Sequence, residues 1–120
     1  MLKYHKEIGF KSEDVILAKG LIDTLQGKPF VFSKHSYEAL LQEADNLKIV
    51  ETIKGYSLNF GDVFELVIDN NRVIKIGFRI AFNDKDIIII LSDNKYIITL
   101  WVNDKIDNHY TLNPRNYCKV

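Results

Sequence analysis

The sequence predicts an α+β fold in which N-terminal helices pack on one face of a four-stranded antiparallel β-sheet arranged as a meander. Two observations support this: apolar residues recur at helical spacing as far as Gly55, and extended apolar runs separated by short turn sequences follow from Asp62 onward. The 120 residues are 47% hydrophobic and 27% charged, which is ordinary globular usage and enough for one core. We therefore expect a single domain over residues 1–120.

The first helix is expected in the segment SEDVILAKGLIDTLQGKP. Ser12 is a candidate N-cap, and acidic residues follow it, where the positive end of a helix favours them. Gly27 and Pro29 mark the end of this helix. Four residues at helical spacing define its apolar face: Val15, Ala18, Ile22 and Leu25.

A second helix is expected to follow the extended segment PFVF. Ser33 is its candidate N-cap, and His35 then falls in the first helical turn. Four residues are expected to form its apolar face: Tyr37, Leu40, Leu41 and Ala44. A further short helix or turn is expected in NLKIVETIKG, ended by Gly55.

Four runs rich in Ile, Val, Phe and Tyr predict the strands: DVFELVI, RVIKIGFRIAF, DIIIILS and KYIITLWVN. The sequences between them, DNN, NDK and DN, are short enough for hairpins, which favours the antiparallel meander. The third run has no polar alternation, so we expect it at the centre of the sheet with both faces covered.

Alternation in the second and fourth runs indicates which side chains face away from the core. In the second run Arg79 has the opposite parity to Ile76, Phe78 and Ile80. In the fourth run Thr99 falls on the more polar parity, together with Ile97, Trp101 and Asn103. Arg79 and Thr99 share a face only in one hairpin register, because a slip of one residue reverses every side chain.

Composition and spacing exclude several chemistries. Sixteen basic residues balance sixteen acidic ones, so no global charge attracts nucleic acid or acidic lipid, and any anion must be held locally. Neither GxxxxGK nor GxGxxG occurs, and the histidines are too scattered for a local metal site, so no cofactor or metal is expected. Cys118 is the only cysteine, and no apolar run is long enough to cross a membrane.

The residues that remain can support acid–base chemistry on a phosphodiester. His35 can exchange protons near neutral pH and lies where helix amides attract anions. Arg79 and Lys34 can supply positive charge, and Thr99 can donate a hydrogen bond to a phosphate oxygen. These groups suffice for RNA cleavage without a metal, in which the 2′-hydroxyl attacks the adjacent phosphate.

The sequence between Pro29 and Leu112 resembles the BECR superfamily of ribonucleases. The resemblance lies in helices that lead into a four-stranded antiparallel sheet, and in FSKHSYEAL, IGFRIAF and YIITLW with their histidine, arginine and threonine. This superfamily includes barnase, EndoU, tRNA-cleaving colicins, RelE-type toxins and phage-borne or contact-dependent toxin domains.

The resemblance implies a role for each matching residue. His35 would be the general acid or base, Arg79 the phosphate stabiliser and Thr99 a hydrogen-bonding residue in the transition state. Glu65 is a further candidate base, since barnase-like enzymes use a glutamate. Candidate substrate-binding residues are Lys34, Trp101, Asn103 and His109.

The expected function is therefore a small toxin-like endoribonuclease that needs no metal, with tRNA among its candidate substrates. Its expected partner is an antitoxin or immunity protein, and its expected site of action is the cytoplasm, reached by delivery from another cell if the domain belongs to a larger secreted toxin. The alternative is a noncatalytic binding protein of a phage or mobile element. In that case His35 is a solvated residue near a helix cap, Arg79 is an outward strand residue or a partner of Glu65, and Thr99 is an ordinary strand residue.

Overall fold

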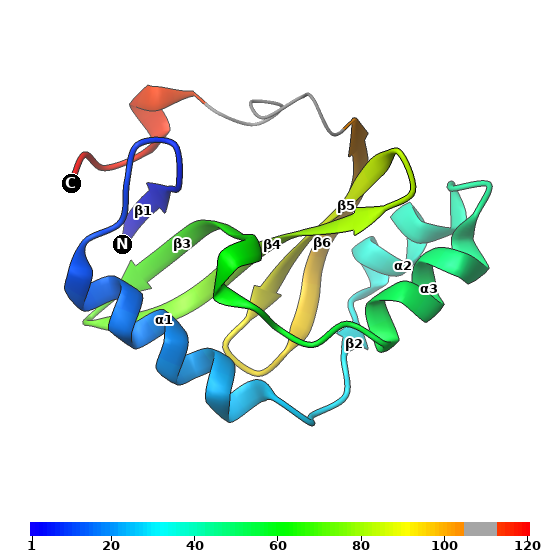
Figure 1. The fold of residues 1–120 in the computed structure, drawn as a ribbon, viewed down its shortest axis with the longest axis horizontal. Helices are drawn as coiled ribbons and strands as arrows, with labels where there is room; N and C mark the ends of the chain where they lie inside the picture. Colours follow the sequence, from blue (N-terminus) through cyan, green and yellow to red (C-terminus); the bar gives the residue numbers. More distant parts are fainter. Residues whose placement is uncertain (105–112) are drawn as a thin grey trace.

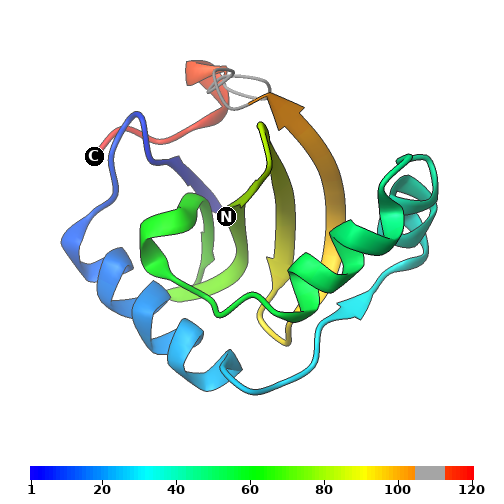
Figure 2. The ribbon, with the colours of Figure 1, turned by 45° about the vertical axis from the view of Figure 1, so that its right-hand side comes forward.

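The computed structural model describes residues 1–104 and 113–120, and it is an α+β structure (Figure 1). Three helices pack on one face of a curved six-stranded sheet, as Figure 2 shows from a second angle. The helices are α1 (Ser12–Leu25), α2 (Lys34–Leu41) and α3 (Asn46–Lys54). The strands, in chain order, are β1 (Leu2–His5), β2 (Val31–Phe32), β3 (Val63–Asp69), β4 (Arg72–Phe82), β5 (Lys85–Ser92) and β6 (Tyr96–Asp104).

The prediction of an α+β fold is confirmed, whereas the prediction of a four-stranded sheet preceded by all the helices is wrong. The strand order is β1-β3-β4-β5-β6-β2, so the expected meander forms only the four inner strands. The additional strand β1 pairs antiparallel with β3, and β2 pairs parallel with β6 through two residues. Because β1 and β2 alternate with α1 and α2 along the chain, the helices are not all N-terminal to the sheet.

The core lies between the helices and one face of the sheet. From β4 it receives Ile76, Phe78 and Ile80, as the alternation predicts, while α1 contributes Ala18 and Ile22. The central position of the isoleucine-rich run is also confirmed, because β5 lies between β4 and β6 and its residues 87–91 are all buried. Each inner strand therefore presents one face to the helices and the other to the opposite side of the sheet.

A register shift changes the expected face of one residue in β6. Thr99 pairs with Ile90, but the next pair joins Ile97 to Leu91, so Ile98 is the extra residue of an irregularity. Ile97 thus turns into the core together with Leu100, although simple alternation places it beside Thr99. The prediction for Thr99 itself is unaffected by the shift.

The apolar face predicted for the second helix is confirmed for Leu40 and wrong for Tyr37, Leu41 and Ala44. Tyr37 and Leu41 are each 52% exposed and Ala44 follows the end of α2, whereas Ser36 and Leu40 are buried. Since α2 is only eight residues long and packs mainly against one strand, β6, only a narrow side of it faces the sheet. None of the described helices combines the length and apolarity that crossing a membrane requires.

Candidate functional site on the open face of the sheet

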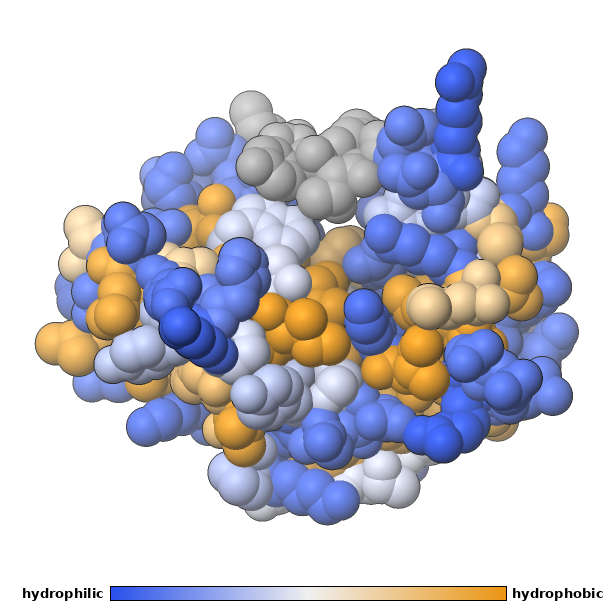
Figure 3. Space-filling view, turned by 180° about the vertical axis from the view of Figure 1, so that it is seen from behind, coloured by the Kyte–Doolittle hydropathy of each residue, from blue (hydrophilic) through white to orange (hydrophobic). Residues whose placement is uncertain are grey.

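The face of the sheet that points away from α1, α2 and α3 collects most of the polar side chains of interest. Strand pairing aligns Arg79 with Ile88 and Ile88 with Trp101, so all three project from this face. We call it the open face and define it by Lys3, His5, Glu65, Gly77, Arg79, Asp86, Ile88, Ile90, Thr99, Trp101 and Asn103. In Figure 3, a view from behind, apolar side chains lie in a hollow near the middle and hydrophilic ones surround them.

The observed register places four of the sequence-predicted residues together on the open face. Thr99 pairs with Ile90 and Ile90 with Gly77, which lies two residues from Arg79 on β4. Trp101 and Asn103 follow Thr99 on the same side of β6. The hairpin register required for Arg79 and Thr99 to share a face is therefore the one that forms.

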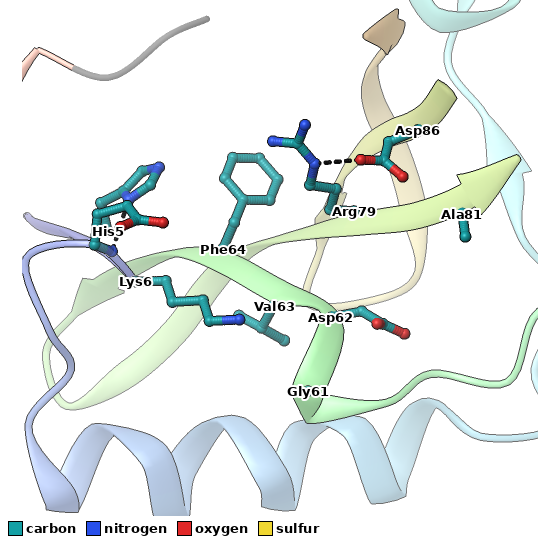
Figure 4. A pocket seen from close by; sticks show the side chains of 10 residues that line it. His5, Lys6, Gly61, Asp62, Val63, Phe64, Arg79, Ala81 and Asp86 are labelled. Atoms are coloured by element: carbon teal, nitrogen blue, oxygen red, sulfur yellow. Dashed lines mark hydrogen bonds and ion pairs between the residues drawn. The ribbon is translucent and has the colours of Figure 1, made fainter. Parts of the chain in front are cut away.

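Two acceptors among the described residues hold Arg79 in place. Its Nε donates to Asp86 Oδ2 at 2.5 Å, as Figure 4 shows, and its Nη2 donates to the backbone carbonyl of Asp104 at 2.9 Å. The Arg79 side chain is 21% exposed. Among the described residues its carboxylate partner is thus Asp86 rather than Glu65, so the guanidinium is fixed in direction while part of its charge is offset.

Glu65 lies at the centre of a second polar cluster on the same face. It is 8% exposed, and its Oε1 lies 3.0 Å from Lys3 Nζ and accepts a hydrogen bond from the Tyr117 hydroxyl, also at 3.0 Å. The His5 ring stands edge-on to the Tyr117 ring, with 5.0 Å between centroids. His5 Nδ1 accepts the backbone N–H of Glu7 at 3.0 Å, which assigns the hydrogen of the neutral imidazole to Nε2.

The Phe64 ring separates these two clusters. A register shift between Val63 and Glu65 turns Phe64 toward the open face, where its ring lies over Gly77. In Figure 4 the ring stands between His5 and Arg79. The bulge in β3 therefore supplies an apolar wall at the centre of the polar site.

A cavity of about 300 Å³ opens beside this wall, where β3 begins and β4 continues past it. Its described lining holds three basic or imidazole side chains, His5, Lys6 and Arg79, and three acidic ones, Glu7, Asp62 and Asp86. Asp62 Oδ2 also accepts the Tyr56 hydroxyl at 2.7 Å; burial, and secondly this bond, raises the pKa of Tyr56. The cavity thus presents both donors and acceptors to a ligand.

The structure does not bring His35 to this cavity. His35 is exposed in the first turn of α2, where Ser33 forms the N-cap by accepting the N–H of Ser36, as predicted. The Ser33 hydroxyl also bonds the Ile98 carbonyl, which anchors the start of α2 to β6. Two inter-strand spacings of about 4.8 Å separate β6 from β4, so this turn lies roughly 10 Å or more from the strand that carries Arg79.

Two sequence-predicted residues remain, Lys34 and His109. Lys34 lies beside His35 on α2, exposed and 3.9 Å from Glu38. His109 lies outside the described residues. Within the described part of the chain, no group of three or more His, Cys, Asp or Glu side chains is placed to hold a metal ion.

Sequence reasoning missed Lys3, His5 and Tyr117 as members of the site. These residues come from β1 and from the C-terminal segment, and they meet Glu65 only because β1 pairs with β3. The available signal was the short alternation of LKYH, which places Lys3 and His5 on one side of a strand. Comparison with protein-family models, with curated proteins and with solved structures finds no match to this chain.

Proposed function

We propose that this chain is a metal-independent endoribonuclease that binds RNA on the open face of its sheet. The observation that carries the proposal is the placement of a buried carboxylate and a fixed guanidinium on that face. Glu65 pairs with Gly77, and Arg79 lies two residues further along β4. Such diagonal neighbours have Cα atoms about 7 to 8 Å apart. The Phe64 ring lies between the two clusters, so in this proposal it moves aside when a phosphate contacts both side chains.

In the proposed reaction Glu65 accepts the proton of a ribose 2′-hydroxyl. The 2′-oxygen then forms a bond to the adjacent phosphorus, and Arg79 stabilises the charge that develops on the phosphate oxygens. The bond to the 5′-oxygen breaks and that oxygen takes up a proton, which gives a 2′,3′-cyclic phosphate and a free 5′-hydroxyl. Two imidazoles compete as the source of this proton, His5 on the open face and His35 on α2.

The β6 side of the open face supports binding of single-stranded RNA. Trp101 offers an aromatic ring to a base, because base–aromatic stacking tolerates any sequence. Thr99 and Asn103 offer hydrogen-bonding groups on either side of it along the strand. tRNA loops are candidate substrates, and an antitoxin or immunity protein that covers this face is the expected partner.

Incubation of the pure protein with total RNA in excess chelator tests the proposal. We expect discrete fragments with 2′,3′-cyclic phosphate ends, and their loss in Glu65→Gln, which keeps the acceptor for Lys3 and Tyr117 but removes the base. Arg79→Lys should slow cleavage at least about tenfold, since an ammonium lacks the planar fork. Glu38→Gln on the exposed side of α2 is the matched control and should cut like the wild type.

His5→Gln and His35→Ala distinguish the two proton donors in the same assay. Only the variant that removes the donor should lose cleavage of ordinary RNA while still cutting a substrate with an activated leaving group, which needs no protonation. The endoribonuclease proposal is wrong if the folded wild type leaves RNA intact under all these conditions, or if Glu65→Gln cuts as fast as the wild type.

A noncatalytic binding module is the second candidate, and two observations favour it. Arg79 is already paired with Asp86 and the Asp104 carbonyl, and His35 lies apart from it. Induced expression separates the two functions in cells. Growth arrest that disappears with Glu65→Gln supports the nuclease, while harmless expression of a folded wild type supports the binding module.

A further inference from the structure

A second cavity lies away from the Glu65 cluster, and among the described residues its lining contains lysines but no acidic side chain. It has a volume of about 470 Å³ and is formed where the ends of α1 and α3 meet the turn between β5 and β6, which lie together in Figures 1 and 2. We call it the basic pocket and define it by Lys28, Lys54 and Lys95, the rings of Phe30 and Tyr56, and Ser57. It shares no described lining residue with the cavity beside Arg79.

Lys95 is the most unusual residue of the basic pocket. It is 4% exposed and has a φ of +68°, in the left-handed region that non-glycine residues rarely adopt. Its Nζ donates to the carbonyl of Lys28 and lies 4.3 Å from the centroid of the Phe30 ring. Burial lowers the pKa of Lys95, and no carboxylate forms an ion pair with it among the described residues.

A buried cation without a carboxylate is costly, as is a left-handed backbone at a residue with a side chain. The bond to Lys28 and the contact with Phe30 offset part of this cost and fasten the segment before β2 to the turn. A purely structural tether needs no positive charge, however, since a neutral donor could bond the same carbonyl. The charge itself therefore calls for a separate explanation.

The negative partial charges at the helix ends are too small to balance the three lysines of the pocket. The C-terminal ends of α1 and α3 border the pocket, and each contributes a partial charge of about −0.5. Together they offset about one positive charge. The remaining positive charge lies on Lys28 and Lys54, which are exposed and partly screened by solvent. With no acidic residue among the described lining, this balance favours an anion such as a phosphate.

We propose that the basic pocket binds a small phosphate-bearing ligand with a planar ring, of the size of a mononucleotide. Lys95, Lys54 and Lys28 surround the phosphate, the Ser57 hydroxyl donates to it, and Phe30 and Tyr56 contact the ring. The volume falls in the usual range of small-molecule sites. This site does not depend on the chemistry proposed for the open face.

Binding of AMP, inorganic phosphate and adenosine, followed by calorimetry and by amide chemical shifts, tests the proposal. We expect AMP to bind more tightly than phosphate, adenosine to bind at least about tenfold more weakly than AMP, and shifts to concentrate at Phe30, Ser57 and Lys95. Lys54→Gln should weaken AMP binding about tenfold. The matched control is Lys48→Gln, also exposed on α3 but outside the pocket, and it should bind AMP like the wild type.

Lys95→Met tests the buried ammonium directly and should abolish AMP binding while the protein still melts cooperatively. If that variant does not fold, AMP binding by Lys54→Gln and Lys28→Gln decides the question, because both side chains are exposed and their replacement should leave the fold intact. Three results would overturn the site. They are the absence of AMP and phosphate binding, amide chemical-shift changes outside the pocket, and equal losses of AMP affinity in Lys48→Gln and Lys54→Gln. Adenosine as tight as AMP would refute the role of the phosphate, and phosphate as tight as AMP would refute the role of the ring. RNA cleavage is not a readout here, so failure of this proposal is distinct from failure of the ribonuclease.

Discussion

Gly77 illustrates how a single residue shapes the candidate site. A Cβ at this position would lie 2.7 Å from the Phe64 ring and 2.9 Å from Ile90 Cδ1, closer than real Cβ atoms approach other atoms. Glycine is normally unfavourable inside a strand, so its place in the middle of β4 needs a reason. The reason here is space, because the Phe64 ring occupies the volume that a side chain at residue 77 would fill.

We predict that Gly77→Ala lowers the free energy of unfolding by about 1 to 3 kcal/mol, since the added methyl group must displace Phe64 or Ile90. Denaturant titration of the wild type and the variant measures this change in the free energy of unfolding. Gly20→Ala is the matched control, because nothing lies within 4 Å of a Cβ there and the position is an exposed helix interior, where alanine should add about 0.5 to 1 kcal/mol. Equal changes in the free energy of unfolding for the two substitutions would show that the backbone preference of glycine, not crowding by Phe64, dominates at Gly77.

Single residues also show the limit of sequence reasoning about the site. Arg79, Thr99 and Trp101 could be placed on one face because alternation within a strand is local. The partners of Glu65 could not be found, since Lys3 and Tyr117 approach it from segments far away in the chain. The chemistry of His35 and its place beside a helix cap predict a catalytic role, but neither indicates how far α2 lies from β4.

At the scale of elements, the two candidate N-cap serines behave differently. Ser33 caps α2 by accepting the Ser36 amide and also bonds Ile98 on β6. Ser12, in contrast, is the first residue of α1, whose N-cap is Lys11 with no side-chain cap bond. The sequence pattern at both sites is a serine before a helix, so it could not reveal this one-residue offset.

Ser33→Ala should therefore destabilise the protein by about 1 to 2 kcal/mol, because the N–H of Ser36 loses its acceptor. Ser12→Ala should change the free energy of unfolding by less than about 0.5 kcal/mol. Thermal and denaturant unfolding of the two variants side by side provide the comparison. A larger loss in Ser12→Ala than in Ser33→Ala would contradict the capping geometry.

Element prediction succeeded for β3 to β6 and failed for the two outer strands. The four inner strands are long, apolar and joined by short turns, so their pairing follows from local pattern. β2 has two residues and pairs parallel with a strand more than 60 residues away, which no local pattern encodes. β1 is only four residues long, and its partner β3 lies beyond all three helices.

At the scale of the whole molecule, both ends of the chain meet on one edge of the sheet, as Figure 1 shows. The amide of Cys118 donates to the carbonyl of Lys3 at 2.7 Å, and the buried Tyr117 bonds Glu65. The C-terminal segment thus holds β1 against β3 and closes one end of the open face. The predicted meander, with no outer strand, left this closure out.

Ending the chain after Asn116 should therefore loosen β1 and lower stability. Loss of the buried Tyr117 ring and of its hydrogen bond should cost about 2 to 4 kcal/mol in the free energy of unfolding. Hydrogen exchange should accelerate in β1 more than in the central strand β5, because β1 depends on this segment and β5 is paired on both sides. A chain that ends after Cys118 keeps Tyr117 and the Cys118 amide, so it should exchange like the full-length protein. Uniform acceleration across all strands, or none in β1, would show that the C-terminal segment does not fasten this edge of the sheet.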